Sequence, residues 1–407
     1  MKTIKGGITA AKGFKAAGYG AEIKYKNRKD MAMIYSERLC STAGVFTSNV
    51  VKAAPVVWDK NITRNKGVAQ AVVVNSGIAN ACTGTQGAEV CQKTADAVGK
   101  IFNIPSDTVL IGSTGVIGMQ MPMDRVEKGV EALSGMLSDT VEAGTQAAEA
   151  IMTTDTYSKE IALEFEIDGK VCHMGAMAKG SGMIHPNMCT MLCFVTSDVA
   201  ISHEMLQKAL SEVVVDTYNM ISVDGDMSTN DSLMILANGM AGNTAITSEG
   251  EDYNKFYEAL NTLCTEMAKK HAADGEGATA LFECHVVNAD TKENARVLAK
   301  SVICSSLTKA AIYGHDANFG RILCALGYSG VEFDPDKVIL NLVSEAGSVN
   351  VYKEGTPMEF DEEEATKILS QKCVTAYVDM QAGDQEATAW GCDLTYDYVK
   401  INADYRS

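Results

Sequence analysis

The sequence predicts an α+β fold built from layers of sheets and helices. Short runs of β-branched and apolar residues, typical of buried strands, gather in groups along the chain, and helical patterns lie between the groups. This arrangement favours layers over the strict alternation of strand and helix in a Rossmann sheet. No repeat of fixed period and no low-complexity segment is present. With 407 residues, 46% of them hydrophobic, the chain is long enough for one large or two moderate domains.

The first half of the chain mixes strands, helices and a glycine-rich loop. The predicted elements, in order, are a buried strand at 69–75, a helix carrying Val90, Ala95 and Val98, a strand at 109–111, a glycine-rich loop at 112–118, and a helix that opens at Asp124 and carries Val126, Val130 and Leu133. The valine-rich strands and the apolar stripes of the helices are the sequence features that support these elements.

The second half continues in the same style. Its predicted elements are a buried strand at 191–195, a helix that follows the capping box at 248–251 and stops before Asp274, a hairpin of strands 338–343 and 349–353, a helix at 361–371, strands at 374–378 and 387–394, and a tail at 395–401 that docks as a strand.

Charge excludes nucleic acid as a partner. Lys and Arg number 35 and Asp and Glu 52, which gives a net charge of −17, whereas phosphate binding needs clustered cations. The densest basic cluster, residues 24–29, is interrupted by Tyr25 and Asn27 and followed by Asp30, and we interpret it as a solvated strand edge. A membrane is not expected as a partner, because no apolar run approaches the ~20 residues that span a bilayer. Residues 1–10 lack the apolar stretch of a signal peptide.

Cysteine and histidine usage indicates a cytoplasmic protein without a metal. Of the 12 cysteines, none forms C-x-x-C and most lie in apolar runs, a pattern typical of small buried hydrophobic residues in a reducing compartment. The six histidines show neither H-x-x-x-H nor H-E-x-x-H spacing, so no zinc site is expected. Neither a metal nor an organic cofactor is required by these patterns.

The segment around Thr190 is the most informative for chemistry. A glycine-rich loop with one cation, Lys179, leads through a Pro-Asn turn into the apolar strand that follows Thr190. A Thr hydroxyl becomes a good nucleophile only beside a base. If the peptide bond between Cys189 and Thr190 is cut, the new α-amino group, with a pKa of about 7.7–8.0, can be that base. The alternative is that Thr190 is merely a β-branched strand residue.

Three further segments offer candidate site residues. In the loop at 112–118, glycines free backbone N–H groups that could hold a developing negative charge, and Thr114 adds a hydroxyl; a plain strand-to-helix turn is the alternative. Residues 153–156 cluster three hydroxyls, and the segment Asp274-Gly275-Glu276-Gly277 carries a carboxylate on a flexible backbone. Capping roles are the alternative for both.

Together these segments resemble the ornithine acetyltransferase family (ArgJ-type), the bifunctional glutamate N-acetyltransferases of arginine biosynthesis. The resemblance runs the whole length of the chain and is highly specific. The motifs that carry it are residues 6–10, 12–14, 75–77, 82–84, 113–118, 152–156, 179–184, 186–192, 274–279, 320–323 and 393–403.

The resemblance implies a role for each candidate residue. Thr190 is implied as the nucleophile, exposed by self-cleavage after Cys189, and Thr114 with Gly115 as the oxyanion hole. The implied substrate contacts are Thr153 or its neighbour Thr154, Lys179, Thr190, Glu276, Asn402 and Ser407. We expect Lys179 to bind a carboxylate and Glu276 an ammonium group.

The resemblance also implies the fold and the reaction. The fold is a layered α/β/β/α sandwich of the DmpA aminopeptidase type, self-cleaved into an α chain 1–189 and a β chain 190–407 that interleave in one core, with room for a smaller C-terminal subdomain. Two copies of each chain assemble as α2β2 or a larger oligomer. The reaction is acetyl transfer from N-acetylornithine to glutamate through acetyl-Thr190 in the cyclic arginine pathway.

Some features depart from the family pattern or leave alternatives open. Cys189 stands where Ala usually precedes the nucleophile, Ile78 where Asn is common and Ala280 where Lys is common. These motifs do not decide whether acetyl-CoA is also a donor. The main alternative is an N-terminal-nucleophile amidohydrolase or aminopeptidase in which water replaces glutamate; the other is a binding protein that keeps the fold.

Overall fold

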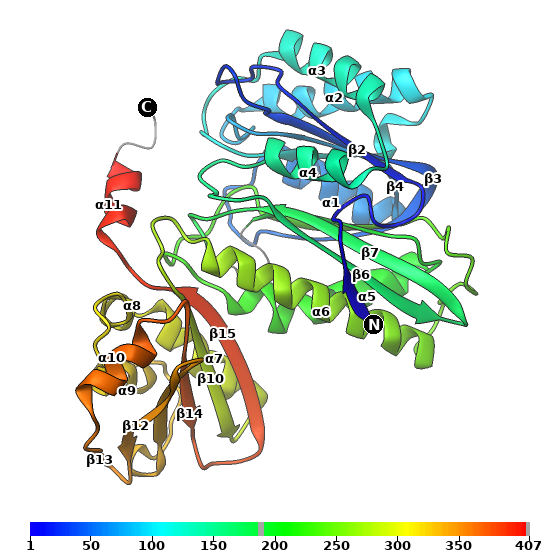
Figure 1. The fold of residues 1–407 in the computed structure, drawn as a ribbon. Coiled ribbons are helices and arrows are strands. Elements are labelled where there is room, and N and C mark those ends of the chain that lie inside the picture. The colour runs from blue at the N-terminus through cyan, green and yellow to red at the C-terminus, as the bar shows by residue number, and fades with distance from the viewer. Residues whose placement is uncertain (186–190, 404–407) are drawn as a thin grey trace. The chain divides into compact units, whose positions relative to one another are not determined.

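The computed structural model describes residues 1–185 and 191–403, and these pack as two compact units, each with its own sheet (Figure 1). The first unit comprises Met1–Gly180, Asn187–Val215 and Met227–Met267, and the second Ser181–Pro186, Asp216–Asp226 and Ala268–Ser407. The predicted α+β class is therefore confirmed. The division follows packing, whereas the predicted boundary between residues 189 and 190 concerns cleavage and stays a prediction.

The sheet of the first unit has nine strands in the order β1-β6-β7-β8-β9-β3-β4-β5, with β2 paired to β3. The strands are β1 (Lys2–Ile4), β2 (Phe14–Tyr19), β3 (Met31–Phe46), β4 (Val68–Asn75), β5 (Val109–Ser113), β6 (Lys159–Ile167), β7 (Lys170–Lys179), β8 (Leu192–Ser197) and β9 (Ser232–Ala237). The two strands that follow residue 190, β8 and β9, are neighbours and lie between strands that precede it, because β8 pairs with β7 and β9 pairs with β3.

The long strand β3 joins two halves of the sheet that face each other. Its first part pairs with β4, its register shifts between Tyr35 and Cys40, and its last six residues pair with β9. Val74 of one half and Phe194 of the other belong to one buried cluster. A Cβ added to Gly112 of β5 would lie 2.9 Å from the Phe194 ring. The apolar faces of the two halves therefore share one core.

Helices cover the outer faces of both halves. They are α1 (Ala54–Asn61), α2 (Thr85–Phe102), α3 (Met123–Met136), α4 (Val141–Ala150), α5 (His203–Asp216) and α6 (Glu251–Ala273). Apolar residues of α2 and α3 pack with Val73 and Ile111 in a second buried cluster, while α5 and α6 lie along the opposite face of the unit (Figure 1). The layers run helix, strand, strand, helix, as the predicted α/β/β/α sandwich requires.

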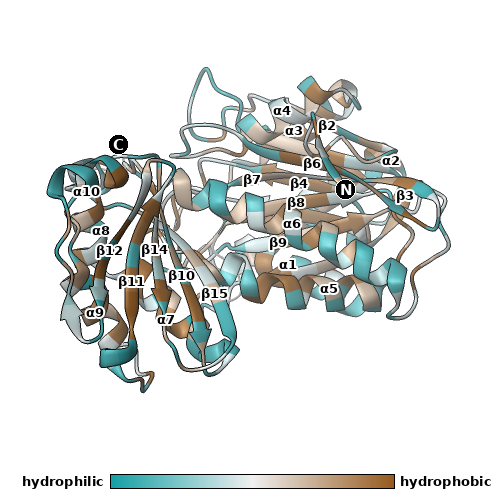
Figure 2. Cartoon of the chain, turned by 60° about the horizontal axis from the view of Figure 1, so that its bottom comes forward, coloured by the Kyte–Doolittle hydropathy of each residue, from teal (hydrophilic) through white to brown (hydrophobic). Residues whose placement is uncertain are grey.

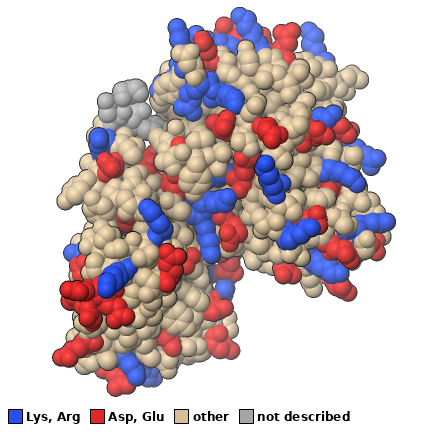
Figure 3. All heavy atoms as spheres, in the orientation of Figure 1, with Lys and Arg blue, Asp and Glu red and all other residues tan. Residues whose placement is uncertain are grey.

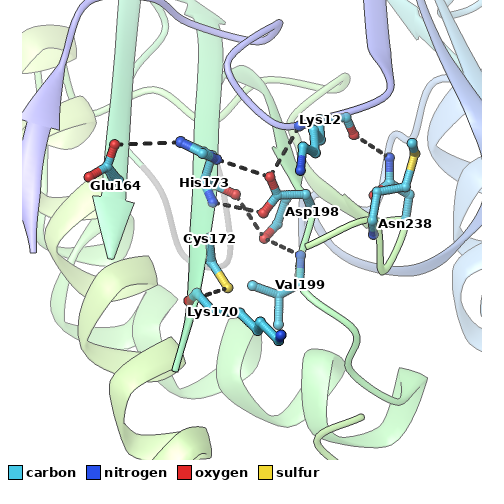
Figure 4. Close-up of polar contacts among 10 residues, drawn as sticks. Lys12, Glu164, Lys170, Cys172, His173, Asp198, Val199 and Asn238 are labelled. Atoms are coloured by element: carbon cyan, nitrogen blue, oxygen red, sulfur yellow. Dashed lines mark hydrogen bonds and ion pairs between the residues drawn. The ribbon is translucent and has the colours of Figure 1, made fainter. Parts of the chain in front are cut away.

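A polar cluster fixes the end of β7 opposite to Lys179. The Asp198 carboxylate accepts the His173 N–H at 2.7 Å and lies 3.1 Å from the His173 ring nitrogen Nδ1. It also accepts the Lys12 N–H at 3.2 Å, and Glu164 lies 3.6 Å from the other ring nitrogen (Figure 4). Asp198 is fully buried, so these contacts satisfy its charge and hold the N-terminal loop on the sheet.

The second unit has a six-stranded sheet in the order β13-β12-β11-β14-β10-β15, in which only β10 and β14 are parallel among the described strands. The strands are β10 (Leu281–Ala289), β11 (Ile339–Ser344), β12 (Gly347–Lys353), β13 (Thr356–Pro357), β14 (Cys373–Asp379) and β15 (Gln385–Cys392). The helices are α7 (Lys292–Cys304), α8 (Ser306–Tyr313), α9 (Phe319–Gly327), α10 (Glu362–Leu369) and α11 (Tyr396–Ala403). The central strands are largely hydrophobic (Figure 2).

Two expectations about local structure were wrong. Residues 24–29, predicted as a solvated strand edge, form a loop between β2 and β3. The tail at 395–401, predicted as a strand, is helix α11. Its alternating aromatic residues suggested a strand, but a helix satisfies its backbone within itself and needs no sheet edge. The other predicted elements are present within a few residues of their expected bounds.

Candidate active site

The loop after β5 is held in place along its backbone. The Thr114 N–H donates to the Asn75 carbonyl at 3.0 Å, and the Val116 N–H donates to the Gly77 carbonyl at 3.1 Å. In return the Ala79 N–H donates to the Val116 carbonyl at 3.0 Å. These hydrogen bonds hold the loop against the segment that follows β4. The backbone N–H groups of the loop that take no part in them are therefore fixed in position.

Gly115 is required for the shape of this loop. Its φ of +127° is a conformation that side chains rarely adopt, and a Cβ at this position would lie 2.3 Å from the carbonyl carbon of Gly77. Within the described part of the chain, the Gly115 N–H and the Thr114 hydroxyl have no hydrogen-bond partner. Both residues are half-buried. Two fixed, unused donors are what an oxyanion hole needs.

Lys179, the last residue of β7, is buried next to a network centred on Asp155. The Asp155 carboxylate accepts hydrogen bonds from Lys159 Nζ at 2.7 Å and from the Gly180 N–H at 2.6 Å. Burial alone would raise the pKa of Asp155, but the cations of Lys179 and Lys159 outweigh burial and hold this pKa well below its usual range. Asp155 is therefore a carboxylate that balances a buried cation at the strand end. The sequence motif contained Asp155, but sequence reasoning assigned it no role.

Thr153 and Thr154 lie beside the same carboxylate. The Thr153 N–H donates to Asp155 Oδ2 at 3.0 Å, and both threonines are half-buried. The Thr153 hydroxyl has no partner among residues 1–185 and 191–403. Asp155 therefore ties the threonine turn to the strand end that carries Lys179.

A polar segment before β9 connects these parts and was missed by sequence reasoning. Asn230 Nδ2 donates to the Ser113 carbonyl at 2.8 Å, and the Ser232 N–H donates to the Met191 carbonyl at 2.8 Å. Asp231 between them is buried, and burial raises the pKa of its carboxyl group well above its usual value. The only signal in the sequence was a run of polar residues entering an apolar strand, which ordinary turns also show.

In the second unit, Glu276 and Asn402 form a direct contact. Asn402 Nδ2 of α11 donates to Glu276 Oε2 at 2.7 Å, and the Glu276 N–H donates to the Ser181 carbonyl at 2.8 Å. Gly277 allows the approach, because it has φ +71° and a Cβ there would lie 2.7 Å from the Tyr398 nitrogen. Glu276 is buried. Two residues 126 positions apart, both predicted as substrate contacts, are thus brought together.

Three predicted site residues, Cys189, Thr190 and Ser407, lie outside the described residues. The described chain resumes at Met191. Leu192, the first residue of β8, pairs with Lys179 across the sheet. Self-cleavage and the role of Thr190 stay predictions.

Comparison with protein-family models matches residues 15–407 to the ArgJ family. This chain belongs to the ArgJ family. The arginine biosynthesis bifunctional protein ArgJ of Caldanaerobacter subterraneus subsp. tengcongensis is 50% identical over 407 residues, covering 100% of both chains. The protein of the same name from Symbiobacterium thermophilum is 50% identical over 409 residues, again covering 100% of both. The resemblance inferred from the motifs is therefore confirmed.

A solved structure from the ArgJ family is also similar. The crystal structure of arginine biosynthesis bifunctional protein ArgJ from Bacillus halodurans is 45% identical and matches with a TM-score of 0.50. The match covers 52% of this chain and 97% of that chain. This similarity supports the layered α+β fold for the part of the chain that the match covers.

Other features of this ArgJ family member concern metals, thiols and membranes. Across the described residues, no group of three or more His, Cys, Asp or Glu side chains could hold a metal ion. Eleven described cysteines are free thiols, and most are buried. Every helix in the described ranges falls short of the length or apolar character needed to cross a membrane.

Proposed function

We propose that this ArgJ family member is a glutamate N-acetyltransferase that moves the acetyl group of N-acetylornithine to glutamate through an acetyl-Thr190 intermediate. The observation that carries the proposal is the pair of fixed donors, the Thr114 hydroxyl and the Gly115 N–H, which have no partner in the described part of the chain. Acyl transfer passes through an oxyanion, and such donors stabilise it. The full-length relatives are named for arginine biosynthesis, which supports these substrates.

The reaction runs in two halves. The α-amino group of Thr190 takes the proton of the Thr190 hydroxyl, whose oxygen attacks the acetyl carbonyl of N-acetylornithine. Thr114 and Gly115 hold the oxyanion. The C–N bond breaks, the amine of ornithine takes the proton, and ornithine leaves. The amino group of glutamate then attacks acetyl-Thr190 by the same steps in reverse, which gives N-acetylglutamate and restores the hydroxyl.

The charged residues supply recognition of the amino-acid groups. We assign Lys179 to a substrate carboxylate and Glu276 to a substrate ammonium, with Thr153, Asn402 and Ser407 as polar contacts. Lys179 is buried beside Asp155, which supports a fixed cation, and Asn402 orients the Glu276 carboxylate. The choice of Thr153 over Thr154 is supported by the Thr153 hydroxyl, which has no partner among the described residues.

Self-cleavage between Cys189 and Thr190 creates the α-amino group, with an α chain 1–189 and a β chain 190–407 assembled as α2β2. In the step itself, the Thr190 hydroxyl attacks the Cys189 carbonyl, the peptide bond shifts to an ester, and water hydrolyses the ester. The small side chain of Cys189 is compatible with this attack. The free cysteines support a reducing, cytoplasmic location. We also propose acetyl-CoA as a second acetyl donor, in keeping with the word bifunctional in the relatives' names.

The test combines processing and turnover. The purified protein should run as two pieces on a denaturing gel, with the second piece beginning Thr-Met-Leu-Cys, and Thr190→Ala should remain one chain near 43.4 kDa. The wild type should form ornithine from N-acetylornithine at high rate only when glutamate is added. Equal ornithine release without glutamate would instead identify a hydrolase, and cleavage of Thr190→Ala would refute the self-cleavage mechanism.

A further inference from the structure

The basic loop, residues 24–29 between β2 and β3, is held in a defined conformation by hydrogen bonds at both of its ends. Asp30, the residue that follows the loop, is buried, and its carboxylate accepts the Ala21 N–H at 2.7 Å and the Ile23 N–H at 2.6 Å, just before the loop. Asp30 also ties the loop to the strand end before the oxyanion loop, because its carbonyl accepts the Ser76 N–H at 2.9 Å. The cations of the basic loop are therefore held at a defined place on the first unit.

The basic loop concentrates positive charge in a chain whose net charge is −17. Lys24 Nζ and the Arg28 guanidinium lie 4.5 Å and 5.6 Å from the centre of the Tyr25 ring. Lys26 is exposed and has no partner among the described residues, whereas Lys29 is paired with Glu149 at 2.9 Å. Blue side chains gather in the part of Figure 3 where the dark-blue loop of Figure 1 lies. Lys24 also donates to the Tyr25 hydroxyl at 2.6 Å. Two cations over one aromatic ring, together with exposed Lys26 next to it in the sequence, thus form no ion pair with a carboxylate in the described chain.

The basic loop lies against the oxyanion loop. A Cβ added to Gly77 would lie 3.1 Å from Lys24 Cβ, and Gly77 is the residue that packs against Gly115. On its other side, the Arg28 guanidinium donates to the Met152 carbonyl at 2.5 Å, one residue before Thr153. The basic loop is therefore at the rim of the two segments that we assign to the oxyanion and to the substrate.

We propose that the basic loop binds the phosphate groups of acetyl-CoA when this molecule serves as acetyl donor. The inference rests on the proposed second donor. A single carboxylate is balanced by one cation, and buried Lys179 supplies that cation, so three additional cations at the rim match a ligand with several phosphates. The long arm of coenzyme A lets the thioester reach Thr114 and Gly115 while its phosphates stay at the rim.

The chemical step balances without any other reactant. The Thr190 oxygen attacks the thioester carbonyl, the C–S bond breaks, and the proton taken by the α-amino group passes to the sulfur. Coenzyme A leaves as the thiol, and the acetyl group remains on Thr190. In the second half of the reaction, the amino group of glutamate attacks acetyl-Thr190, as it does when N-acetylornithine is the donor.

The experiment compares two donors in the same variants. Lys26→Ala, Lys26→Glu and the double variant Lys24→Ala/Lys26→Ala are assayed with glutamate and either acetyl-CoA or N-acetylornithine. Arg28 is left unchanged because it supports Met152. Lys100→Ala, at the C-terminal end of α2 and exposed, is the matched control. Binding of coenzyme A itself is measured by calorimetry on the wild type and each variant.

We expect the KM for acetyl-CoA and the Kd for coenzyme A to rise about 5–30-fold in the double variant, with Lys26→Glu worse than Lys26→Ala, because charge-assisted contacts are lost. The KM for N-acetylornithine and both kcat values should stay within twofold, and Lys100→Ala should behave as wild type. Absence of coenzyme A binding to the wild type, or equal losses with both donors, would overturn the inference. Failure of transfer from N-acetylornithine in the wild type would refute the proposed function separately, since coenzyme A binding is read directly.

Discussion

Thr114 shows how one side chain can be chemically free while its backbone is fixed. Its backbone N–H donates a hydrogen bond to the Asn75 carbonyl, but its hydroxyl has no hydrogen-bond partner in the described part of the chain. A substitution at this position therefore removes a donor and leaves the loop in place. This separation makes Thr114 the clearest test of the proposed oxyanion hole.

Thr114→Ala should lower kcat by about 10²–10³, the usual cost of one oxyanion donor. KM should change little, because the donor acts mainly on the transition state. Thr114→Ser keeps a hydroxyl and should retain most of the activity. Steady-state kinetics with N-acetylornithine and glutamate measure both constants, and a loss confined to KM would make Thr114 a substrate-binding residue instead.

His185 gives a residue-scale prediction for stability. Burial, helped by the nearby Lys300 cation, lowers the pKa of His185 to about 4, whereas in the unfolded chain it is about 6.5. Between these values the unfolded chain binds more protons, so stability is complete above about pH 6.5 and falls as the pH drops toward 4. His185→Asn cannot take a proton and should show a smaller loss of Tm between pH 7.5 and 4.5. Equal losses in both proteins would contradict this assignment.

At the scale of the element, the tail that was predicted as a strand is helix α11, which carries the proposed substrate contact Asn402. In a helix, positions 398 and 402 lie one turn apart on the same face. Tyr398 is within 3.3 Å of an Asp224 oxygen and Asn402 within 2.7 Å of Glu276. In a strand these two positions would also share a face, but they would lie about 13 Å apart rather than the about 6 Å of one helical turn. The helix therefore brings the two side chains closer together than a strand would.

Asn402→Ala should raise KM for N-acetylornithine by about 5–100-fold, since a lost contact to a charged group costs about 1–3 kcal/mol. Lys400→Ala, exposed on the same helix, is the control and should be neutral. Measurements of kcat and KM, together with Tm, separate weaker binding from unfolding.

Deletion of residues 405–407 should leave folding and self-cleavage intact, because the proposed nucleophile and oxyanion donors belong to other segments. Acetyl transfer should fall through weaker amino-acid binding, by one or two polar contacts of about 1–3 kcal/mol each. Unchanged kcat/KM for N-acetylornithine in the truncated enzyme would remove Ser407 from the substrate contacts.

At the scale of the whole molecule, cleavage after Cys189 should not separate the pieces. Strand β7 precedes the proposed cut and β8 follows it, and they pair from Met174 with Ser197 to Lys179 with Leu192. Strand β3 likewise pairs with β9. Breaking one peptide bond leaves this hydrogen-bonded sheet and its core intact.

The cleaved protein should therefore elute from a sizing column as one species that contains both pieces, and separate only in denaturant. Gel filtration followed by a denaturing gel of the peak measures this. Elution of the two pieces at different volumes in native buffer would contradict a shared core.

Local patterns in the sequence were sufficient for several elements and for the family. The strand at 69–75 and the helix carrying Val90 and Val98 were predictable because their apolar spacing matches one secondary structure. The loop containing Thr114 and Gly115 was recognisable because glycines mark special backbone positions. Ordered motifs along the whole chain indicated the ArgJ-type family without any three-dimensional information.

The sequence by itself thus determined the fold class, the family and most individual candidate residues. Only the tertiary structure revealed the interaction partners of these residues. The Asp155 carboxylate lies near the Lys179 cation, Asn402 donates a hydrogen bond to Glu276, and Asn230 donates one to the Ser113 carbonyl, 117 positions away in the sequence. The tertiary structure also decided that the tail is a helix and that β3 joins two facing half-sheets. The physical reason is that propensity and spacing act over a few residues, whereas hydrogen bonds and buried charges pair groups across the fold.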